Sequence, residues 1–400
     1  MPQKAPHVIH ISADFPDCIE PFKTPVIKTL VRMTQGDFSH EVLSLNRVTP
    51  RVLPFVARLM RGFGRPQAAI SFEPFEQGTA IRFVAPPKGL FHATMLHQLA
   101  DALADRIARQ GRPPALLIGH KLTIEGVVAR RVAKRLNVPY AVSIQGDTDT
   151  KILRVRPDLA AEFRKVFQEA AVVFPFSPWS LRKVEAKLGQ RGGRVIMLPC
   201  PTDIDAPVAP VPGGNGFVSC FHLKNHKRKN LAGMVDAMRI LNADQAGARL
   251  SIIGGGSDGD VNDSRAAIGE VAGIELAGPM NRDQLRESFG TATAFVMPSH
   301  RESFGLVFIE ALFCGLPIIY PADQAVDGYF DGAPFAIKVD ARNPAAIAAA
   351  MRNAMTDETA IKRALAQWQN SADARRFMRP AIAANFALGM NSAIAAAEPR

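Results

Sequence analysis

The chain has 400 residues, which is enough for two or three domains that each bury a core. Hydrophobic residues at 47% and charged residues at 21% are ordinary for a folded globular protein and exclude long-range disorder. The net charge of +11 is concentrated in residues 1–200, which carry 29 Lys and Arg against 16 Asp and Glu, whereas residues 201–400 carry 19 against 21. We therefore expect an anionic partner to meet the first half of the chain.

Simple sequence features exclude several other classes of protein. No apolar run approaches about 18 residues, and the N-terminus continues into Val8–Ile11 without an apolar signal core, so we expect neither a membrane span nor export. The four cysteines lie far apart without clustered His partners, which indicates a reducing cytoplasm and no zinc site or disulfide framework. With only 3 Tyr and 2 Trp to interleave with basic residues, nucleic acid is not an expected partner.

Residues 1–200 alternate strand-like apolar runs with helical patterns. The predicted strands are Val8–Ile11, Glu41–Leu45, Ala80–Val84, Ala115–Ile118, Tyr140–Ile144, Val172–Phe176 and Arg194–Leu198. Amphipathic patterns predict helices over Met95–Arg109 and Ile124–Leu136, the second ended by Asn137 and Pro139. This alternation predicts a parallel α/β lobe.

A proline-rich stretch, Leu198–Gly214, predicts the boundary between two lobes, 1–200 and 201–378. Beyond it, strands are predicted over Gly216–Phe221, Arg249–Ile253, Ile274–Leu276, Ala294–Met297 and Pro317–Tyr320, and helices over Leu231–Leu241, Arg282–Gly290 and Phe304–Phe313. The fold class expected is α/β, with two Rossmann-like doubly wound lobes facing a cleft and ligands beyond the carboxyl ends of the strands. Residues 379–400 are expected to form a helix that returns to the first lobe.

The segment 295–317 contains the most informative motif, a strand, a polar turn and a helix followed by Gly315 and Pro317. We expect the turn to place Glu302 before the helix, with the backbone N–H groups of Phe304, Gly305 and Leu306 free. A helix N-terminus of this kind binds phosphate. Glu310 follows on the helix, where its carboxylate could accept hydrogen bonds from sugar hydroxyls.

This combination of Glu302, Phe304-Gly305-Leu306, Glu310-Ala311 and Gly315-x-Pro317 resembles the signature of retaining GT-B glycosyltransferases of family 4, the group 1 transferases. The resemblance implies that Glu302 faces the donor sugar, that Glu310 binds the ribose and that residues 304–306 hold the diphosphate. It also implies a nucleotide-diphosphate sugar as donor, no cofactor and no metal. The alternative is an amphipathic helix with two solvated glutamates.

The basic stretch 221–231 resembles the family segment in which an Arg and a Lys clamp the diphosphate. Lys229 matches the Lys position. His222 stands at the Arg position, with Lys227 or Arg228 as candidate substitutes. A solvated basic loop is the alternative.

Gly254 and Gly278 resemble the strand ends that lie beneath the nucleotide in this family. Gly254, Gly256 and Gly259 also fit a dinucleotide-binding pattern with Glu275 downstream. We do not favour that alternative, because residues 257–264 are rich in Asp and Gly and are not expected to open a helix.

In the first lobe, Gln145 stands where many family members carry a His near the donor sugar, so it could orient the donor but not act as a base. Asp147-x-Asp149 suggests a metal motif, but in this fold cationic groups neutralise the phosphates, so no metal is expected. Lys23 lies in the loop after the first strand, where donor and acceptor meet in relatives.

The range 51–65 predicts a basic amphipathic helix. Its cationic side carries Arg51, Arg58, Arg61 and Arg65, with no acidic residue among them. Such a helix is typical of an anionic membrane surface, although its apolar face could instead pack on the lobe. With the basic first half, it favours a peripheral enzyme on the inner face of a membrane.

Together these features predict a retaining glycosyltransferase that extends a glycan or lipid-linked acceptor in cell-surface polysaccharide or glycolipid synthesis. The alternatives are a nucleotide-sugar epimerase of the same fold and a dinucleotide-dependent oxidoreductase.

Overall fold

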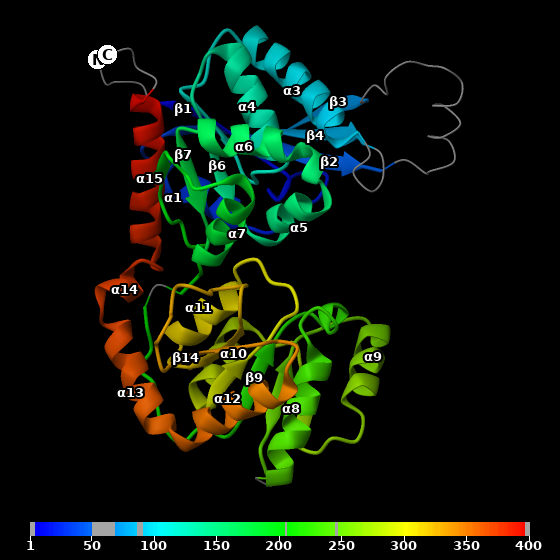
Figure 1. Cartoon of the computed structure of the whole chain (residues 1–400), viewed down its shortest axis with the longest axis vertical. Coiled ribbons are helices and arrows are strands. Elements are labelled where there is room, and N and C mark those ends of the chain that lie inside the picture. The colour runs from blue at the N-terminus through cyan, green and yellow to red at the C-terminus, as the bar shows by residue number, and fades with distance from the viewer. Residues whose placement is uncertain (1–4, 50–68, 86–90, 205, 245–246, 397–400) are drawn as a thin grey trace. The chain divides into compact units, whose positions relative to one another are not determined.

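The computed structural model describes residues 5–49, 69–85, 91–204, 206–244 and 247–396 (Figure 1). The chain divides into two compact units. Unit 1 comprises residues 1–176, 180–198 and 382–400, and unit 2 comprises residues 177–179 and 199–381. Each unit is built on its own sheet with helices on both faces, which confirms the expected α/β class.

Unit 1 contains an eight-stranded sheet in the order β3-β4-β2-β1-β5-β6-β7-β8. The strands are β1 (His7–Ser12), β2 (Ser39–Val48), β3 (Ile70–Phe75), β4 (Gly78–Val84), β5 (Leu116–Gly119), β6 (Tyr140–Ile144), β7 (Val172–Pro175) and β8 (Arg194–Val195). All neighbours are parallel except β3 and β4, which form an antiparallel pair at the edge. The sequence patterns did not predict β3. β1 pairs with both β2 and β5, so the sheet changes winding direction there.

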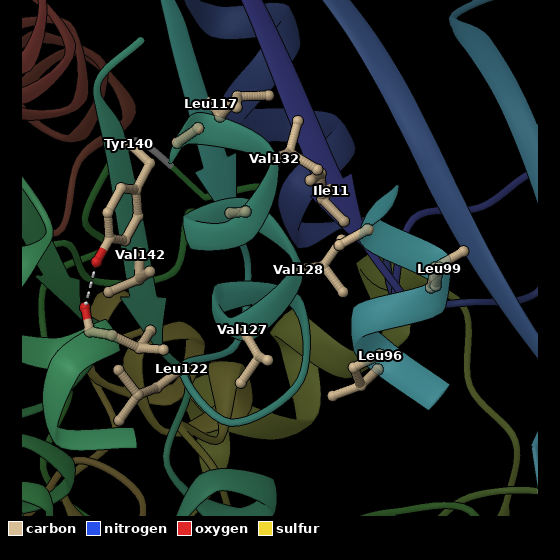
Figure 2. Packing of buried hydrophobic residues seen from close by; sticks show 14 of the residues in the cluster. Ile11, Leu96, Leu99, Leu117, Leu122, Val127, Val128, Val132, Tyr140 and Val142 are labelled. Atoms are coloured by element: carbon tan, nitrogen blue, oxygen red, sulfur yellow. Dashed lines mark hydrogen bonds between the residues drawn. The ribbon is translucent and has the colours of Figure 1, made fainter. Parts of the chain in front are cut away.

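Helices cover both faces of this sheet. They are α1 (Val26–Met33), α3 (His92–Arg109), α4 (Glu125–Leu136), α5 (Asp147–Val155), α6 (Ala160–Glu169), α7 (Pro178–Leu188) and α15 (Arg379–Ala395), with a short 3-10 helix η2 (Pro157–Leu159). The core on one face is formed where α3 and α4 pack on β1, β5 and β6 (Figure 2). Asn137, at a φ of 52°, ends α4 as predicted.

The other face of the sheet is covered by α1 and by the part of α15 that belongs to unit 1. Phe386 of α15 packs against His10 of β1 and Phe174 of β7. Gly389 allows α15 to approach the sheet closely, because a Cβ there would collide with the ring of Phe174. This face therefore holds residues from both ends of the chain.

Unit 2 contains a six-stranded, all-parallel sheet in the order β11-β10-β9-β12-β13-β14. The strands are β9 (Phe217–Cys220), β10 (Leu250–Ile253), β11 (Ile274–Gly278), β12 (Ala294–Val296), β13 (Ile318–Pro321) and β14 (Ala336–Val339). β9 pairs with both β10 and β12, so the winding changes direction between β9 and β12. Open α/β sheets bind ligands beyond the carboxyl ends of strands at such a point.

The helices of unit 2 are η3 (Leu223–Asn225), α8 (Leu231–Asp244), α9 (Asp258–Ile268), α10 (Arg282–Thr291), α11 (Leu306–Phe313), α12 (Pro344–Thr356), α13 (Glu358–Gln369) and α14 (Ala372–Arg375). α8 and α12 lie side by side (Figure 1). Edge-to-face contacts between the rings of Phe289, Phe295 and Phe308 join α10, β12 and α11. Parallel strands that are buried on both faces account for the continuous apolar runs in the sequence.

Lys362 of α13 joins that helix to the proline-rich stretch 198–214 by hydrogen bonds. Its side chain is only 2% exposed, and its ammonium pairs with Glu358 at 2.7 Å. The same ammonium donates to the carbonyl oxygens of Val211 (2.7 Å) and Ala292 (2.8 Å). Glu358 Oε1 in turn accepts from the N–H of Gly214 at 2.8 Å.

We expect Lys362→Ala to lower the free energy of unfolding by about 3 kcal/mol, because Glu358 would keep a largely buried charge without its cation. Denaturant titration of the two proteins measures the change. Arg363→Ala, at an exposed position of the same helix, should change the same quantity by less than about 0.5 kcal/mol. Equal effects of the two substitutions would contradict the role given to Lys362.

Candidate functional site

The loops that follow β9 and β12 in unit 2 are held together by backbone and amide hydrogen bonds. The N–H of His300 donates to the carbonyl oxygen of Arg228 at 2.9 Å. The amide of Asn230, whose φ is 63°, donates to the carbonyl oxygens of Pro298 (3.0 Å) and Ala341 (2.6 Å). These bonds fix the basic loop 221–231 beside the turn that leads into α11.

The N-terminus of α11 has the features of an anion site. The helix begins at Leu306 rather than at Phe304, because Gly305 takes a φ of 73° that a side chain would strain. Within the described part of the chain, the N–H groups of Gly305, Leu306 and Val307 have no hydrogen-bond acceptor. Free N–H groups and the positive end of the helix dipole together attract phosphate. The N–H of Phe304 also has no acceptor among the described residues, although its side chain is buried at 3% exposure.

Glu302 lies just before this helix and forms an ion pair with Lys229 from the basic loop. Their side chains are 12% and 11% exposed, respectively. The second carboxylate oxygen of Glu302 accepts from the N–H of Ser303 at 3.2 Å. The structure therefore brings together two residues that the sequence analysis singled out independently, 73 positions apart.

Gln324, which the sequence analysis missed, fixes the backbone at Glu302. Its Oε1 accepts from the N–H of Glu302 at 2.6 Å, and its Nε2 donates to the carbonyl oxygen of His300 at 2.8 Å. The residues on either side, Asp323 and Ala325, have positive φ values of 59° and 54°. Such conformations cost energy in residues other than glycine and cluster at functional sites. No local sequence pattern could have indicated this contact.

Glu310 lies one turn into α11 and is partly buried. Burial raises the pKa of its carboxyl, the charge of Asp203 raises it further, and the Arg282 guanidinium opposes both effects. Burial also raises the pKa of the Cys220 thiol to about 11, and the charges of Glu310 and Lys229 both act on that thiol. The end of β9 thus lies close to both site residues.

The rest of the basic loop is more open. His222 is exposed and its ring nitrogen accepts from the N–H of Lys224 at 3.3 Å, which caps η3. Lys227 and Arg228 are exposed. Among the residues that the structure describes, Lys227 has no ion-pair partner. An anion bound in this loop would meet Lys227 without displacing another group.

Gly254 and Gly278 lie at the carboxyl ends of β10 and β11, joined by a 2.9 Å hydrogen bond from the N–H of Gly254. Gly254 has a φ of 154°, and a Cβ there would collide with the carbonyl oxygen of Phe221. A glycine is therefore required for β10 to approach the loop after β9.

The expectation that residues 257–264 open no helix is wrong. α9 begins at Asp258, because Ser257 and Asp260 form a reciprocal capping box. The dinucleotide alternative fails for a different reason. Glu275, the acidic residue of that pattern, is the second residue of β11 and lies opposite Ser251 of β10, near the amino end of the strand. The acidic residue of that motif must instead lie where the strand ends.

In unit 1, Gln145 follows β6 and donates from Nε2 to the carbonyl oxygen of His120 at 2.6 Å. Asp149 is fully buried and accepts from the N–H (2.9 Å) and the hydroxyl (2.8 Å) of Thr123. It therefore anchors the start of α5. The described residues contain no cluster of His, Cys, Asp or Glu suited to a metal ion.

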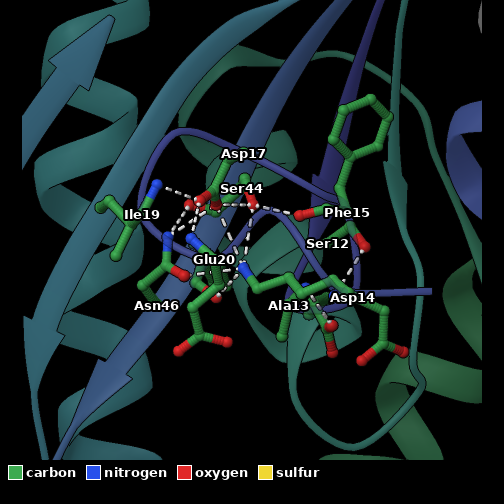
Figure 3. A network of polar contacts seen from close by, with 12 residues as sticks. Ser12, Ala13, Asp14, Phe15, Asp17, Ile19, Glu20, Ser44 and Asn46 are labelled. Atoms are coloured by element: carbon green, nitrogen blue, oxygen red, sulfur yellow. Dashed lines mark hydrogen bonds and ion pairs between the residues drawn. The ribbon is translucent and has the colours of Figure 1, made fainter. Parts of the chain in front are cut away.

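Lys23 is partly buried in unit 1, where its ammonium belongs to a polar network, and its place among acceptor or membrane contacts stays a prediction. Its side chain is 9% exposed, and its ammonium contacts Asp17 (3.1 Å), Ser44 (3.2 Å) and Asn46 (2.7 Å). Ser44 and Asn46 also donate to Asp17 (Figure 3). Arg51, Arg58, Arg61 and Arg65 fall outside the residues that the structure describes.

These hydrogen bonds lower the pKa of Asp17 to about 2 from 3.8, although burial opposes the shift. Because the folded-state pKa is lowered, the stabilisation is present above pH 3.8 and is lost as the pH falls through 2. We expect Asp17→Asn to lower the free energy of unfolding at pH 7 by about 3 kcal/mol, since it leaves a buried ammonium unpaired. Denaturant titrations at pH 7 and pH 2.5 test this, and a difference from wild type that does not shrink at the lower pH would contradict it.

Unit 1 also contains a row of three imidazoles that the sequence analysis did not anticipate, in which His10 and His120 are buried and His40 is partly buried. His10 contacts His120 and His40, each at 2.9 Å, and the row ends on Ser143 (3.3 Å) and Thr34 (3.1 Å). Burial is the main cause that lowers the pKa of His10, and burial with the Lys121 charge lowers that of His120 to about 3. The sheet order brings these residues together from β1, β2 and the end of β5.

Solved structures of other proteins have the same fold as this chain. A sucrose-phosphate synthase from Thermosynechococcus elongatus aligns with a TM-score of 0.67 at 19% identity, covering 98% of this chain and all of that one. An α,α-trehalose-phosphate synthase (UDP-forming) from Burkholderia vietnamiensis aligns with a TM-score of 0.62 at 14% identity, covering 96% and 100%. The expected GT-B fold is thereby confirmed.

The family comparison concerns unit 2. Residues 215–374 match the family described as "Glycosyl transferases group 1", and that range contains the basic loop 221–231, Glu302 and α11. A D-inositol 3-phosphate glycosyltransferase from Acidothermus cellulolyticus is 32% identical over 109 residues, which is 26% of this chain and 24% of the relative. The chain thus matches about a quarter of that relative's length. Residues 215–374 are thus similar to group 1 glycosyltransferases, and the GT-B fold extends over both units.

Proposed function

We propose that this chain is a retaining glycosyltransferase of family 4 that moves a sugar from a nucleotide-diphosphate sugar to an acceptor hydroxyl. The observation that carries the proposal is the N-terminus of α11. Free N–H groups at Gly305, Leu306 and Val307 lie beside the Glu302–Lys229 pair, within the segment that matches the group 1 family. A phosphate at this N-terminus would be neutralised without a metal ion.

Each residue of the donor site then has a distinct role. The diphosphate would bind the α11 N-terminus, with Lys229, Lys227 and His222 as cationic or polar partners. Glu310 would accept hydrogen bonds from the ribose. Burial raises the pKa of its carboxyl, and hydrogen bonds from the ribose hydroxyls would favour the charged carboxylate and so compensate for its lost hydration. Gly254 and Gly278 would lie beneath the nucleoside.

The chemical step would depend on stabilising the leaving diphosphate. Positive charge at the helix N-terminus and at Lys229 would offset the charge that develops as the glycosidic bond to phosphate breaks. Glu302 would hold the donor sugar and offset positive charge on its ring, and Gln145 of unit 1 would orient the sugar by hydrogen bonds. Departure and attack on the same face give retention of anomeric configuration.

The experiment is to incubate the purified protein with a panel of nucleotide sugars and acceptors and to measure nucleoside diphosphate release. Acceptor-dependent release in the presence of EDTA supports the proposal, and the anomeric configuration of the product by NMR tests retention. Isomerised sugar without acceptor would indicate an epimerase instead. Activity lost in EDTA and restored by manganese would contradict metal-free leaving-group stabilisation.

The acceptor proposed is a glycan or lipid-linked saccharide at an anionic membrane surface, in cell-surface polysaccharide or glycolipid synthesis. The charge of residues 1–200 motivates it. No helix among those described is long and apolar enough to cross a bilayer. We expect sedimentation with vesicles that contain phosphatidylglycerol, weaker binding in high salt, and loss of binding when Arg58 and Arg61 are changed to Glu. Equal binding to neutral vesicles would contradict the membrane part of the proposal.

A further inference from the structure

The ion pair between Lys229 and Glu302 links two groups that the proposed function assigns to different parts of the donor. Lys229 is assigned to the diphosphate and Glu302 to the sugar, yet without ligand each holds the other. Both side chains are nearly buried, at 11% and 12% exposure, so water replaces either partner poorly. Binding a diphosphate therefore affects Glu302 as well as Lys229.

The surroundings of Glu302 leave its carboxylate few other partners. Oε1 accepts from the N–H of Ser303 at 3.2 Å, and Oε2 contacts Lys229. The backbone cannot retreat, because Gln324 holds the N–H of Glu302 at 2.6 Å and the carbonyl oxygen of His300 at 2.8 Å. When a phosphate draws Lys229 away, Oε2 is left in a nearly buried position without a donor, which is unfavourable.

A nucleotide sugar and a nucleoside diphosphate differ in the hydrogen-bond donors that they can offer to the carboxylate of Glu302. The sugar carries hydroxyl groups that can donate to Oε2, whereas the diphosphate alone offers only acceptors. Resting on the proposed function, we infer that Glu302 and Lys229 together form a specificity device that penalises the nucleoside diphosphate relative to the nucleotide sugar. The enzyme thus distinguishes its substrate from its product, and product release is favoured once the sugar has left.

The test measures binding by isothermal titration calorimetry without acceptor. It compares UDP, GDP and ADP with their glucose esters, UDP-glucose, GDP-glucose and ADP-glucose. For the nucleotide that wild type binds, Glu302→Gln should lower the Kd of the nucleoside diphosphate at least tenfold, or about 1.4 kcal/mol. The same variant should weaken binding of the glucose ester. Asp283→Asn removes one charge at a side chain that is 95% exposed on α10, and should change neither affinity.

A double-mutant cycle with Lys229→Met separates this device from simple repulsion between Glu302 and phosphate. If the two side chains compete as inferred, Glu302→Gln gains nothing in the Lys229→Met background. A gain that persists there would overturn the inference, and so would unchanged or weaker diphosphate binding by Glu302→Gln alone. If wild type binds none of the diphosphates or glucose esters, the proposed function itself fails and this inference with it.

Discussion

Glu302→Ala is expected to lower turnover by about 10²-fold or more, a loss of roughly 3 kcal/mol of transition-state stabilisation. The carboxylate is nearly buried and accepts from the N–H of Ser303, and its backbone is fixed by Gln324, so in the proposed role it would be preorganised for the sugar ring. Single-turnover kinetics with a saturating nucleotide sugar measure the change. The loss should appear in the chemical step rather than in folding, which the thermal midpoint checks.

Asp283→Ala, on the exposed surface of α10, is the matched control for loss of a carboxylate and should retain wild-type turnover. Glu302→Asp should recover little activity, because the shorter side chain withdraws the carboxylate. Wild-type kinetics in Glu302→Ala would remove this residue from the site.

The imidazoles of His10 and His120 are expected to lower the free energy of unfolding by about 3 kcal/mol between pH 6.5 and pH 5. Glu125, whose pKa burial raises to about 7, offsets part of this fall. Since the pKa values of His10 and His120 are lowered in the folded state, the unfolded chain binds more protons below pH 6.5. As the pH falls, each of these histidines therefore lowers the free energy of unfolding by about 1.36 kcal/mol per pH unit until its folded-state pKa is reached. His40, whose pKa is also lowered, adds in the same direction.

Denaturant titrations across this pH range test the prediction. His120→Gln should be less stable at pH 7 but show a shallower dependence on pH, since one titrating site is gone. A variant as steep as wild type would indicate that other groups cause the acid sensitivity.

Features decided by neighbours along the chain were predictable from sequence. The strand, turn and helix of residues 295–317 were predicted, since apolar period and capping residues both lie within the segment. The start of α11 was placed two residues early, because Gly305 adopts a positive φ that the apolar pattern cannot reveal. α9 was missed, since Asp and Gly were taken as signs of a loop although Ser257 and Asp260 cap the helix.

Features decided by the order of strands in the sheets were not predictable. His10, His40 and His120 come together only because β1 lies between β2 and β5. Gln324 reaches Glu302 because β13 is the neighbour of β12. The polar contacts of Lys23 were likewise not predictable, because β2 supplies the Ser44 and Asn46 side chains that its ammonium contacts.

The clamp formed by Asn230 has a thermodynamic consequence for ligand binding. Its amide joins Pro298, before the turn into α11, to Ala341, after β14, while His300 bonds to Arg228. The loops around the proposed phosphate site are thus joined by hydrogen bonds in the folded protein, so we expect only side chains to rearrange on binding. Nucleotide association should consequently carry a small loss of backbone entropy, and amide hydrogens such as that of His300 should exchange slowly with solvent even without ligand.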